Sequence, residues 1–380
     1  MPTWLFVIQA LLIGATIFAV MPHHVLLRLQ VVVWTIGVVS IAVLVGVDAQ
    51  DRFYSNDQVL HVLLVQTLRD WSWLAETSVV DMRLPYALPA VAISSLGFSE
   101  ILALKSVSLI CLLILSHQLL TRFQSNRPAD QLKTLYMTGC GLIGSFFSLL
   151  ALRETMMMLF AYLFFSRKSP SVRALSITML FLLRPHLAAA LLIGELVSTT
   201  TTRLNTRHSL RSFLTPLSCI ISVVFGKAVV SLNRGGLLGE QSMFLKSFGL
   251  DEIRQIASNF VGLQFLTTGA WNVNFSIGSL VFLRGVLSET ILIPALFTVV
   301  VLLSGPLISR QHLSVLIAFS LYVSIATSTE FNSFRQNIPL MPLLGAVILD
   351  VFAKRRQLKV SSLFSRRFGS TASPIGPRET

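Results

Sequence analysis

The sequence predicts an all-α polytopic integral membrane protein, and three observations support this fold class. Of its 380 residues, 53% are hydrophobic and only 12% are charged, about half the charged fraction that is usual in soluble domains. Apolar segments long enough to cross a bilayer as helices recur along the chain. These segments lack the alternation of apolar and polar residues that marks transmembrane strands. We therefore expect a single transmembrane domain over residues 1–353.

The predicted spans begin close to the N-terminus. Residues 4–20 form an apolar run with neither a basic segment before it nor a clear cleavage motif after it. We interpret this run as a retained helix rather than a signal peptide. Further spans are predicted at 29–47, 101–120, 135–152, 214–232, 286–303, 313–327 and 338–352.

Residues 48–100 predict a large extracytoplasmic loop that contains interfacial helices. Within it, residues 59–74 mix apolar side chains with charges and two tryptophans, a composition typical of helices that lie along a membrane surface. Residues 83–100 contain two prolines and a charge at each end, which favours a short interfacial or re-entrant helix. A second large polar segment, at 233–285, predicts another extracytoplasmic loop.

Two helical hairpins are predicted in the middle of the chain, and each carries charge at its tip. Arg153 and Glu154 interrupt the first apolar stretch, Arg184 and His186 interrupt the second, and a basic turn at 167–173 lies between the hairpins. Charged residues inside apolar helices are costly and tend to face a polar cavity or a partner. We therefore predict that both tips lie together and form one wall of an extracytoplasmic active site.

The distribution of lysine and arginine favours about eleven crossings, with the N-terminus outside and the C-terminus in the cytoplasm. The segments that this topology assigns to the cytoplasm hold 18 of the 30 Lys and Arg residues. They include a basic tail at 354–380, which we expect to be disordered. An alternative with about nine crossings fuses each hairpin into one long helix, which would place Arg153 and Glu154 near the middle of the membrane. We interpret the net charge of +13 as a topology signal, and expect no nucleic-acid partner.

The eleven-crossing topology gathers candidate site residues on the extracytoplasmic side. A carboxylate beside a reacting hydroxyl can act as a general base, and arginines can hold phosphate oxygens in a bidentate fork. A site with both suits the transfer of a group from a lipid phosphate. The candidates on this side include Asp51, Asp57, Arg153, Glu154, Arg184, His186, Glu330 and Arg335.

Each candidate also has a purely structural interpretation. Asp57 can cap the helix that follows it, and His186 can be a hydrogen-bonding structural residue. The other structural roles are a helix-end ion pair (Arg153 with Glu154), an interfacial anchor (Arg184) and a loop salt bridge (Glu330 with Arg335).

The order of these features resembles the GT-C class of membrane glycosyltransferases, especially the bacterial branch related to protein mannosyltransferases and lipid A sugar transferases. Asp57 in YSNDQVLH lies where those proteins carry an Asp, often followed by Glu, in their first large extracytoplasmic loop. LPYALPAVAISSLGFSEILALKSVSLICLLIL looks similar to their proline-rich helix, Leu-Gly turn, basic residue and span, with Lys105 as the basic residue.

The resemblance continues through the second half of the chain. Glu154 in LRETMMMLFAYLFF matches a second acid that opens a short helix, and Arg184 in LFLLRPHLAAALL matches a basic residue after an apolar run. FRQNIPLMPLLGAVI looks like the Arg-x-x-x-Pro-x-x-Pro pattern of the last spans, with Arg335 as its arginine. An extra span before the Asp loop, and Gln in place of a second acid after Asp57, depart from the pattern.

The resemblance implies a polyprenyl-phosphate-linked sugar donor and a glycan or lipid acceptor in cell-envelope assembly, with the protein in a bacterial inner membrane. Asp57 would deprotonate the acceptor hydroxyl, and Glu154 would assist it or hold a divalent metal ion, if one is used. Arg184, with Arg153 and Arg335, would hold the donor phosphate. Alternative functions are a surface-polysaccharide polymerase or ligase, and a lipid or solute transporter or flippase. Transporters often carry internal repeats, and we find no clear repeat in this sequence.

Overall fold

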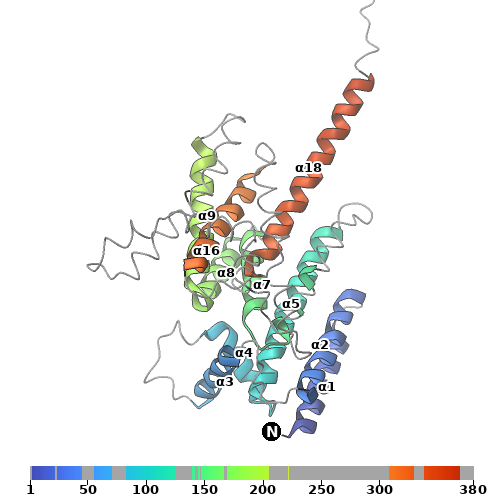
Figure 1. Ribbon diagram of the computed structural model, residues 1–380, viewed down its shortest axis with the longest axis vertical. Helices are drawn as coiled ribbons and strands as arrows, with labels where there is room; N and C mark the ends of the chain where they lie inside the picture. The colour runs from blue at the N-terminus through green and yellow to red at the C-terminus, as the bar shows by residue number, and fades with distance from the viewer. Residues whose placement is uncertain are drawn as a thin grey trace, which may run out of the picture.

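The computed structural model shows a helical bundle (Figure 1). It describes residues 2–21, 24–44, 55–70, 83–124, 139–141, 144–145, 147–166, 169–204, 221, 308–328 and 338–368. Within these ranges the chain is all-helical, as predicted. The predicted span at 286–303, the loop at 233–285, all but residue 221 of the span at 214–232 and part of the span at 135–152 lie outside the described residues.

Helices α1 (Thr3–Val20) and α2 (Val25–Leu44) are both predominantly apolar, and they pack against each other as an antiparallel pair. A small hydrophobic core, which includes Phe6 and Trp34, joins the pair to α5. Helix α2 begins four residues earlier than the predicted span at 29–47. Arg28 therefore lies in its first turn rather than in the connection, with its guanidinium 4.9 Å from the centre of the Phe18 ring.

The predicted interfacial segment contains two helices, α3 (Ser55–Arg69) and α4 (Leu84–Ser94). Both pack against α5 (Glu100–Gln124), the predicted third span, at the end of the bundle where the N-terminus lies (Figure 1). The Leu-Gly turn after α4 has Gly97 at φ 93°, a conformation that glycine adopts without a steric penalty.

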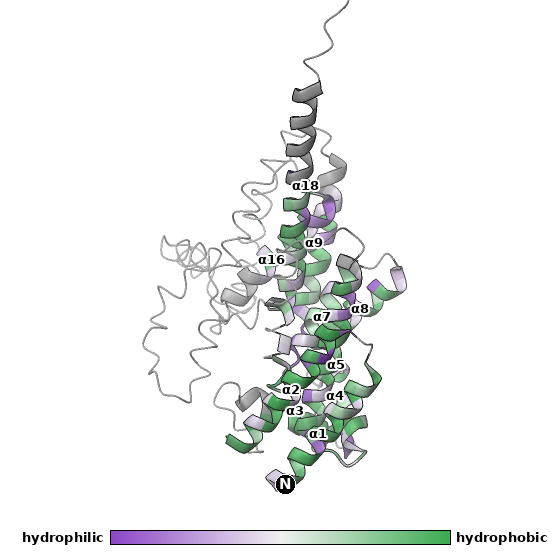
Figure 2. Cartoon of the chain, turned by 90° about the vertical axis from the view of Figure 1, so that its right-hand side faces the viewer, coloured by the Kyte–Doolittle hydropathy of each residue, from purple (hydrophilic) through white to green (hydrophobic). Residues whose placement is uncertain are grey.

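Three described helices, α1, α2 and α5, are long and apolar enough to cross a membrane. Most of their residues are hydrophobic (Figure 2). Their burial differs: 72% of the apolar window of α5 is buried in the bundle, against 17% of that of α1. These properties are those of a helical membrane protein in which α5 lies inside the bundle and α1 lies at its edge.

The double hairpin is built from α7 (Glu154–Ser166), α8 (Pro170–Leu183) and α9 (Pro185–Leu204). The chain turns at residues 149–153 and again at Arg184, so the two fused helices of the nine-crossing alternative are not formed. Proline cannot donate an intrahelical hydrogen bond and disfavours helical backbone in the residue before it, which explains the second break. Helices α7 and α8 are each about 20 Å long at about 1.5 Å per residue.

The last helices of the bundle are α16 (Arg310–Ser328), the 3-10 turn η4 (Ile338–Leu340) and α18 (Met341–Phe368). Helix α16 runs antiparallel to α9 and packs closely against it at Gly194. Helix α18 extends well beyond the bundle (Figure 1). The prediction that the chain is disordered from residue 354 is wrong as far as Phe368, where α18 ends. The helix continues because no proline or glycine interrupts the chain between the last span and Phe368.

Candidate functional site

The turn at residues 149–153, which precedes α7, is held by side chains from three other helices. Trp34 Nε1 of α2 donates a hydrogen bond to the Ser148 carbonyl (3.3 Å). His61 Nδ1 of α3 donates to the Ala151 carbonyl (3.1 Å), and Ser108 Oγ of α5 donates to the Leu152 carbonyl (2.8 Å). Carbonyls that the helices leave without partners are thereby satisfied. The turn presents Arg153 and Glu154 at a defined place.

Arg153 joins the tips of the two hairpins. Its side chain is buried, and Nη1 donates a hydrogen bond to the carbonyl of Leu183, the last residue of α8. This contact brings the tips of the two hairpins together. Glu154 is the first residue of α7 and has no exposed surface. A carboxylate in a first helical turn interacts favourably with the helix dipole.

Arg184 lies between α8 and α9 in extended backbone (φ −161°, ψ 90°). Its Nη1 donates a hydrogen bond to the hydroxyl of Tyr322 on α16 (2.7 Å). A guanidinium carries five N–H donors, and the others on Arg184 have no hydrogen-bond partner among the described residues. Arg184 is partly buried, so these donors can serve an anionic ligand.

Tyr322 is the centre of the site, and sequence reasoning missed it. Its side chain is fully buried, and its ring stacks on His186, with 5.7 Å between ring centroids and an interplanar angle of 16°. Its hydroxyl interacts electrostatically with Arg184, Arg153 and Glu154. A single tyrosine in the apolar run LIAFSLYVSIAT has no periodic or spacing signal that marks it as a site residue.

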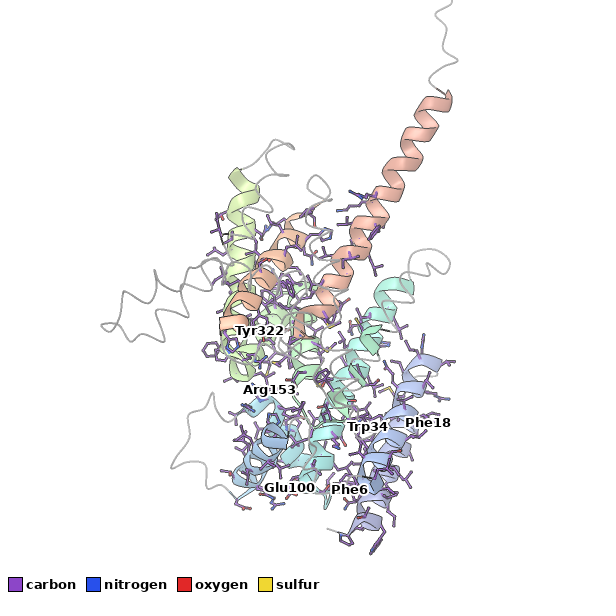
Figure 3. All side chains as sticks on the ribbon, viewed as in Figure 1. Phe6, Phe18, Trp34, Glu100, Arg153 and Tyr322 are labelled. Atoms are coloured by element: carbon purple, nitrogen blue, oxygen red, sulfur yellow. The ribbon has the colours of Figure 1, made fainter. Side chains whose placement is uncertain are left out.

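We name Arg153, Glu154, Arg184, His186 and Tyr322 the tip cluster. Figure 3 labels Arg153 and Tyr322, both of which lie within the bundle on the far side of α3 and α4 from Glu100. The cluster combines two guanidinium groups with one carboxylate, and paired guanidinium groups favour ligands with several anionic oxygens, such as phosphate.

Two other predicted site residues, Asp57 and Lys105, lie in helices outside the tip cluster. Asp57 lies in the first turn of α3, which begins at Ser55. It is therefore neither in the loop before the helix nor the helix N-cap. Lys105 is buried in α5, three residues before Ser108 and thus on the same helix face, which meets the turn at 149–153.

Asp51, Glu330 and Arg335 lie outside the described residues. Within the described ranges, no three His, Cys, Asp or Glu side chains come together as metal ligands would. Glu154 is the one carboxylate of the tip cluster, so we assign no reaction step to a metal ion.

A second polar cluster, which the sequence did not predict, lies farther along α9 and α16. Glu195 Oε1 accepts a hydrogen bond from Arg310 Nη2 (3.0 Å) and forms an ion pair with Arg173 Nη2 (3.3 Å), and its Oε2 accepts from Ser314 Oγ (3.1 Å). These contacts tie α8, α9 and α16 together two to three turns away from Arg184. Both carboxylate oxygens of Glu195 have partners, and two of these partners are arginines. This arrangement indicates a structural role, in which Glu195 holds the three helices together.

Comparison with models of known protein families, with curated protein sequences and with solved structures finds no match to this chain.

Proposed function

We propose that the protein is a membrane glycosyltransferase that moves a sugar from a polyprenyl-phosphate-linked donor to a glycan or lipid acceptor. The observation that carries this proposal is the contact of Arg153 with the Leu183 carbonyl. It brings Arg184 and the buried Glu154 into one cluster where two hairpins meet. Arginine can bind phosphate oxygens through two parallel hydrogen bonds, which suits a lipid phosphate.

In the proposed reaction the acceptor hydroxyl oxygen attacks the anomeric carbon of the donor sugar. The bond between that carbon and the phosphate oxygen breaks, and the phosphate leaves with the bonding electron pair. Asp57 accepts the hydroxyl proton as general base, assisted by Glu154. Arg184 and Arg153, with Arg335, stabilise the negative charge on the leaving phosphate.

The proposed setting is a bacterial inner membrane, with a GT-C-like arrangement of about eleven crossings. The tip cluster would lie on the extracytoplasmic side and the C-terminus in the cytoplasm. The asymmetry of Lys and Arg supports this orientation. It is also supported by Arg173 and Arg310, which lie near the ends of α8 and α16 that are remote from the tip cluster. Helices of about 20 Å are shorter than the roughly 30 Å hydrocarbon core, which would keep the cluster recessed below the membrane surface.

The orientation is tested by labelling single cysteines from outside intact cells. Ser169→Cys, in the basic turn between α7 and α8, should remain unlabelled by a membrane-impermeant reagent, whereas Ser55→Cys should react. Strong labelling at position 169 would overturn the orientation.

The activity is tested with purified protein in liposomes that contain a radiolabelled polyprenyl-phosphate hexose and a lipid or glycan acceptor. We expect the label to move to the acceptor once per donor consumed. Products with many repeat units would identify a polymerase instead. Movement of intact donor across the bilayer without chemical change would identify a flippase. Either result, or no transfer from a panel of hexose donors, would overturn the proposal.

A further inference from the structure

Two residues other than glycine have left-handed backbone among the described residues, Arg83 (φ 47°) and Ala151 (φ 48°). This conformation is unfavourable for residues with a side chain, and it persists where surrounding contacts enforce it, often next to a functional site. Arg83 precedes α4, whereas Ala151 lies in the turn before α7. They are distant in sequence, yet a single side chain, that of His61, makes a hydrogen bond to each of them.

The two contacts determine which nitrogen of the His61 ring carries the proton. Arg83 Nη1 lies 2.6 Å from His61 Nε2, and the Ala151 carbonyl oxygen lies 3.1 Å from His61 Nδ1. A guanidinium only donates hydrogen bonds, and a carbonyl oxygen only accepts them. Nε2 must therefore carry the lone pair and Nδ1 the proton. Neither the other neutral tautomer nor the imidazolium can make both contacts.

A second branch reaches the neighbouring carbonyl, that of Leu152, through α4 and α5. The buried His61 ring packs edge-on against Tyr86 of α4, with 5.2 Å between ring centroids. The Tyr86 hydroxyl lies 3.0 Å from Ser108 Oγ, which donates to the Leu152 carbonyl. Side chains of α3 and α5 thus bond the two carbonyls that immediately precede Arg153, and Arg83 and Tyr86 contact the two donors.

We propose that His61 is a positioning residue that sets the conformation of the 149–153 turn, and with it the placement of the Arg153 guanidinium. Arg83 holds His61 in the tautomer that this role requires. The importance of the placement for sugar transfer rests on the proposed function. The control of the turn by His61 does not, because it concerns the conformation of the protein itself.

The test compares two substitutions that each keep one half of the imidazole. The amide nitrogen of His61→Asn can take the place of Nδ1 and donate to the Ala151 carbonyl. His61→Gln places its amide near the Nε2 position, where it can accept from Arg83 but leaves the Ala151 carbonyl without its donor. A displacement of about 1 Å can lower the rate about 10²-fold. We expect His61→Gln to lower kcat for transfer by about this factor, with the KM for the donor nearly unchanged, and His61→Asn to recover most of the loss.

A second measurement, which does not need activity, is amide hydrogen exchange over residues 147–157 in liposomes. Exchange there should rise in His61→Gln and stay near the parent value in His61→Asn. The matched control is Gln30→Leu, which removes a buried hydrogen bond to Ser116 (3.0 Å) without touching the turn. It should change neither exchange over 147–157 nor kcat.

Equal behaviour of the Asn and Gln variants, or unchanged exchange in His61→Gln, would overturn the inference. If both His61 variants fail to fold, the variant Arg83→Gln is tested in their place. It removes the guanidinium that holds the proton of His61 on Nδ1, and it leaves the imidazole itself unchanged. It should raise exchange over 147–157, and unchanged exchange would again overturn the inference. A parent protein without transfer activity would instead remove the proposed function, while the exchange comparison would still decide the role of His61.

Discussion

The α1–α2 pair and the α7–α9 hairpins are both apolar and helical, but they differ in how much of their surface is buried within the bundle. Only 17% of the apolar window of α1 and 33% of that of α2 are buried within the bundle, whereas 10 of the 13 residues of α7 are buried. The pair is long enough to cross a membrane and faces outward. Helix α7 is too short to cross alone and is enclosed by neighbouring helices.

The side chains that hydrogen-bond to other parts of the bundle also differ between the two regions. In α2 these side chains, Gln30 and Trp34, are uncharged. At the hairpin tips, the charged side chains of Arg153 and Arg184 reach across to α8 and α16. Hydropathy alone identifies helices that can enter a membrane. Charged side chains that cross between helices mark the region for which we propose a ligand.

The largest expected effect is the loss of the general base. Asp57→Asn should lower the transfer rate by about 10² to 10⁴, measured on purified protein in liposomes, while the helix remains intact. The control is Asp70→Asn, directly after the same helix, where an exposed carboxylate lies 3.6 Å from Arg69. Surface ion pairs of this kind contribute little, so the control should behave as the parent does. If activity of Asp57→Asn stays within about threefold of the parent, Asp51 or Glu154 becomes the candidate base.

The next effect compares an arginine from each region. Arg184→Ala should lower transfer by about 10² to 10³, the usual cost of losing one donor to a developing negative charge. Arg184→Lys should restore little, because an ammonium cannot form the bidentate fork. Arg28→Ala in the α1–α2 pair removes only a contact with the Phe18 ring, worth about 0.5 to 1 kcal/mol, and should leave activity near normal. Full activity of Arg184→Lys and Arg184→Gln would remove Arg184 from the site.

The smallest effect concerns packing, and it compares one glycine from each region. A Cβ at Gly194 would lie 2.6 Å from the Ser314 carbonyl oxygen and 2.9 Å from Ala318 Cβ, so α9 and α16 would have to separate. Gly194→Ala should cost about 1 to 3 kcal/mol and lower activity, since Tyr322 would shift relative to Arg184. At Gly14 the added Cβ meets mainly the Thr35 side chain, which can rotate. Thermal unfolding in detergent should show the smaller loss for Gly14→Ala, and the reverse order would contradict this view of the packing.

Much of the helical framework could be predicted from the sequence. The apolar runs predicted α1, α2 and α5, and the Pro-rich segment predicted α4 and its Leu-Gly turn. The charged interruptions predicted the breaks before α7 and at Arg184. Helix ends were less accurate: α2 and α3 begin earlier than predicted, and α18 continues to Phe368. Ends depend on competition between capping, packing and solvent, which short-range patterns describe poorly.

The sequence by itself determined which segments are apolar helices and where charge interrupts them, because hydropathy and helix breaking are local properties of the chain. Only the tertiary structure decided that Tyr322 joins Arg184 and His186, and that His61 joins Arg83 to Ala151. These contacts link residues from distant parts of the chain, and each partner alone is an ordinary residue of its helix. Their pairing follows from how the helices pack, since buried donors and acceptors must find partners within reach once water is excluded.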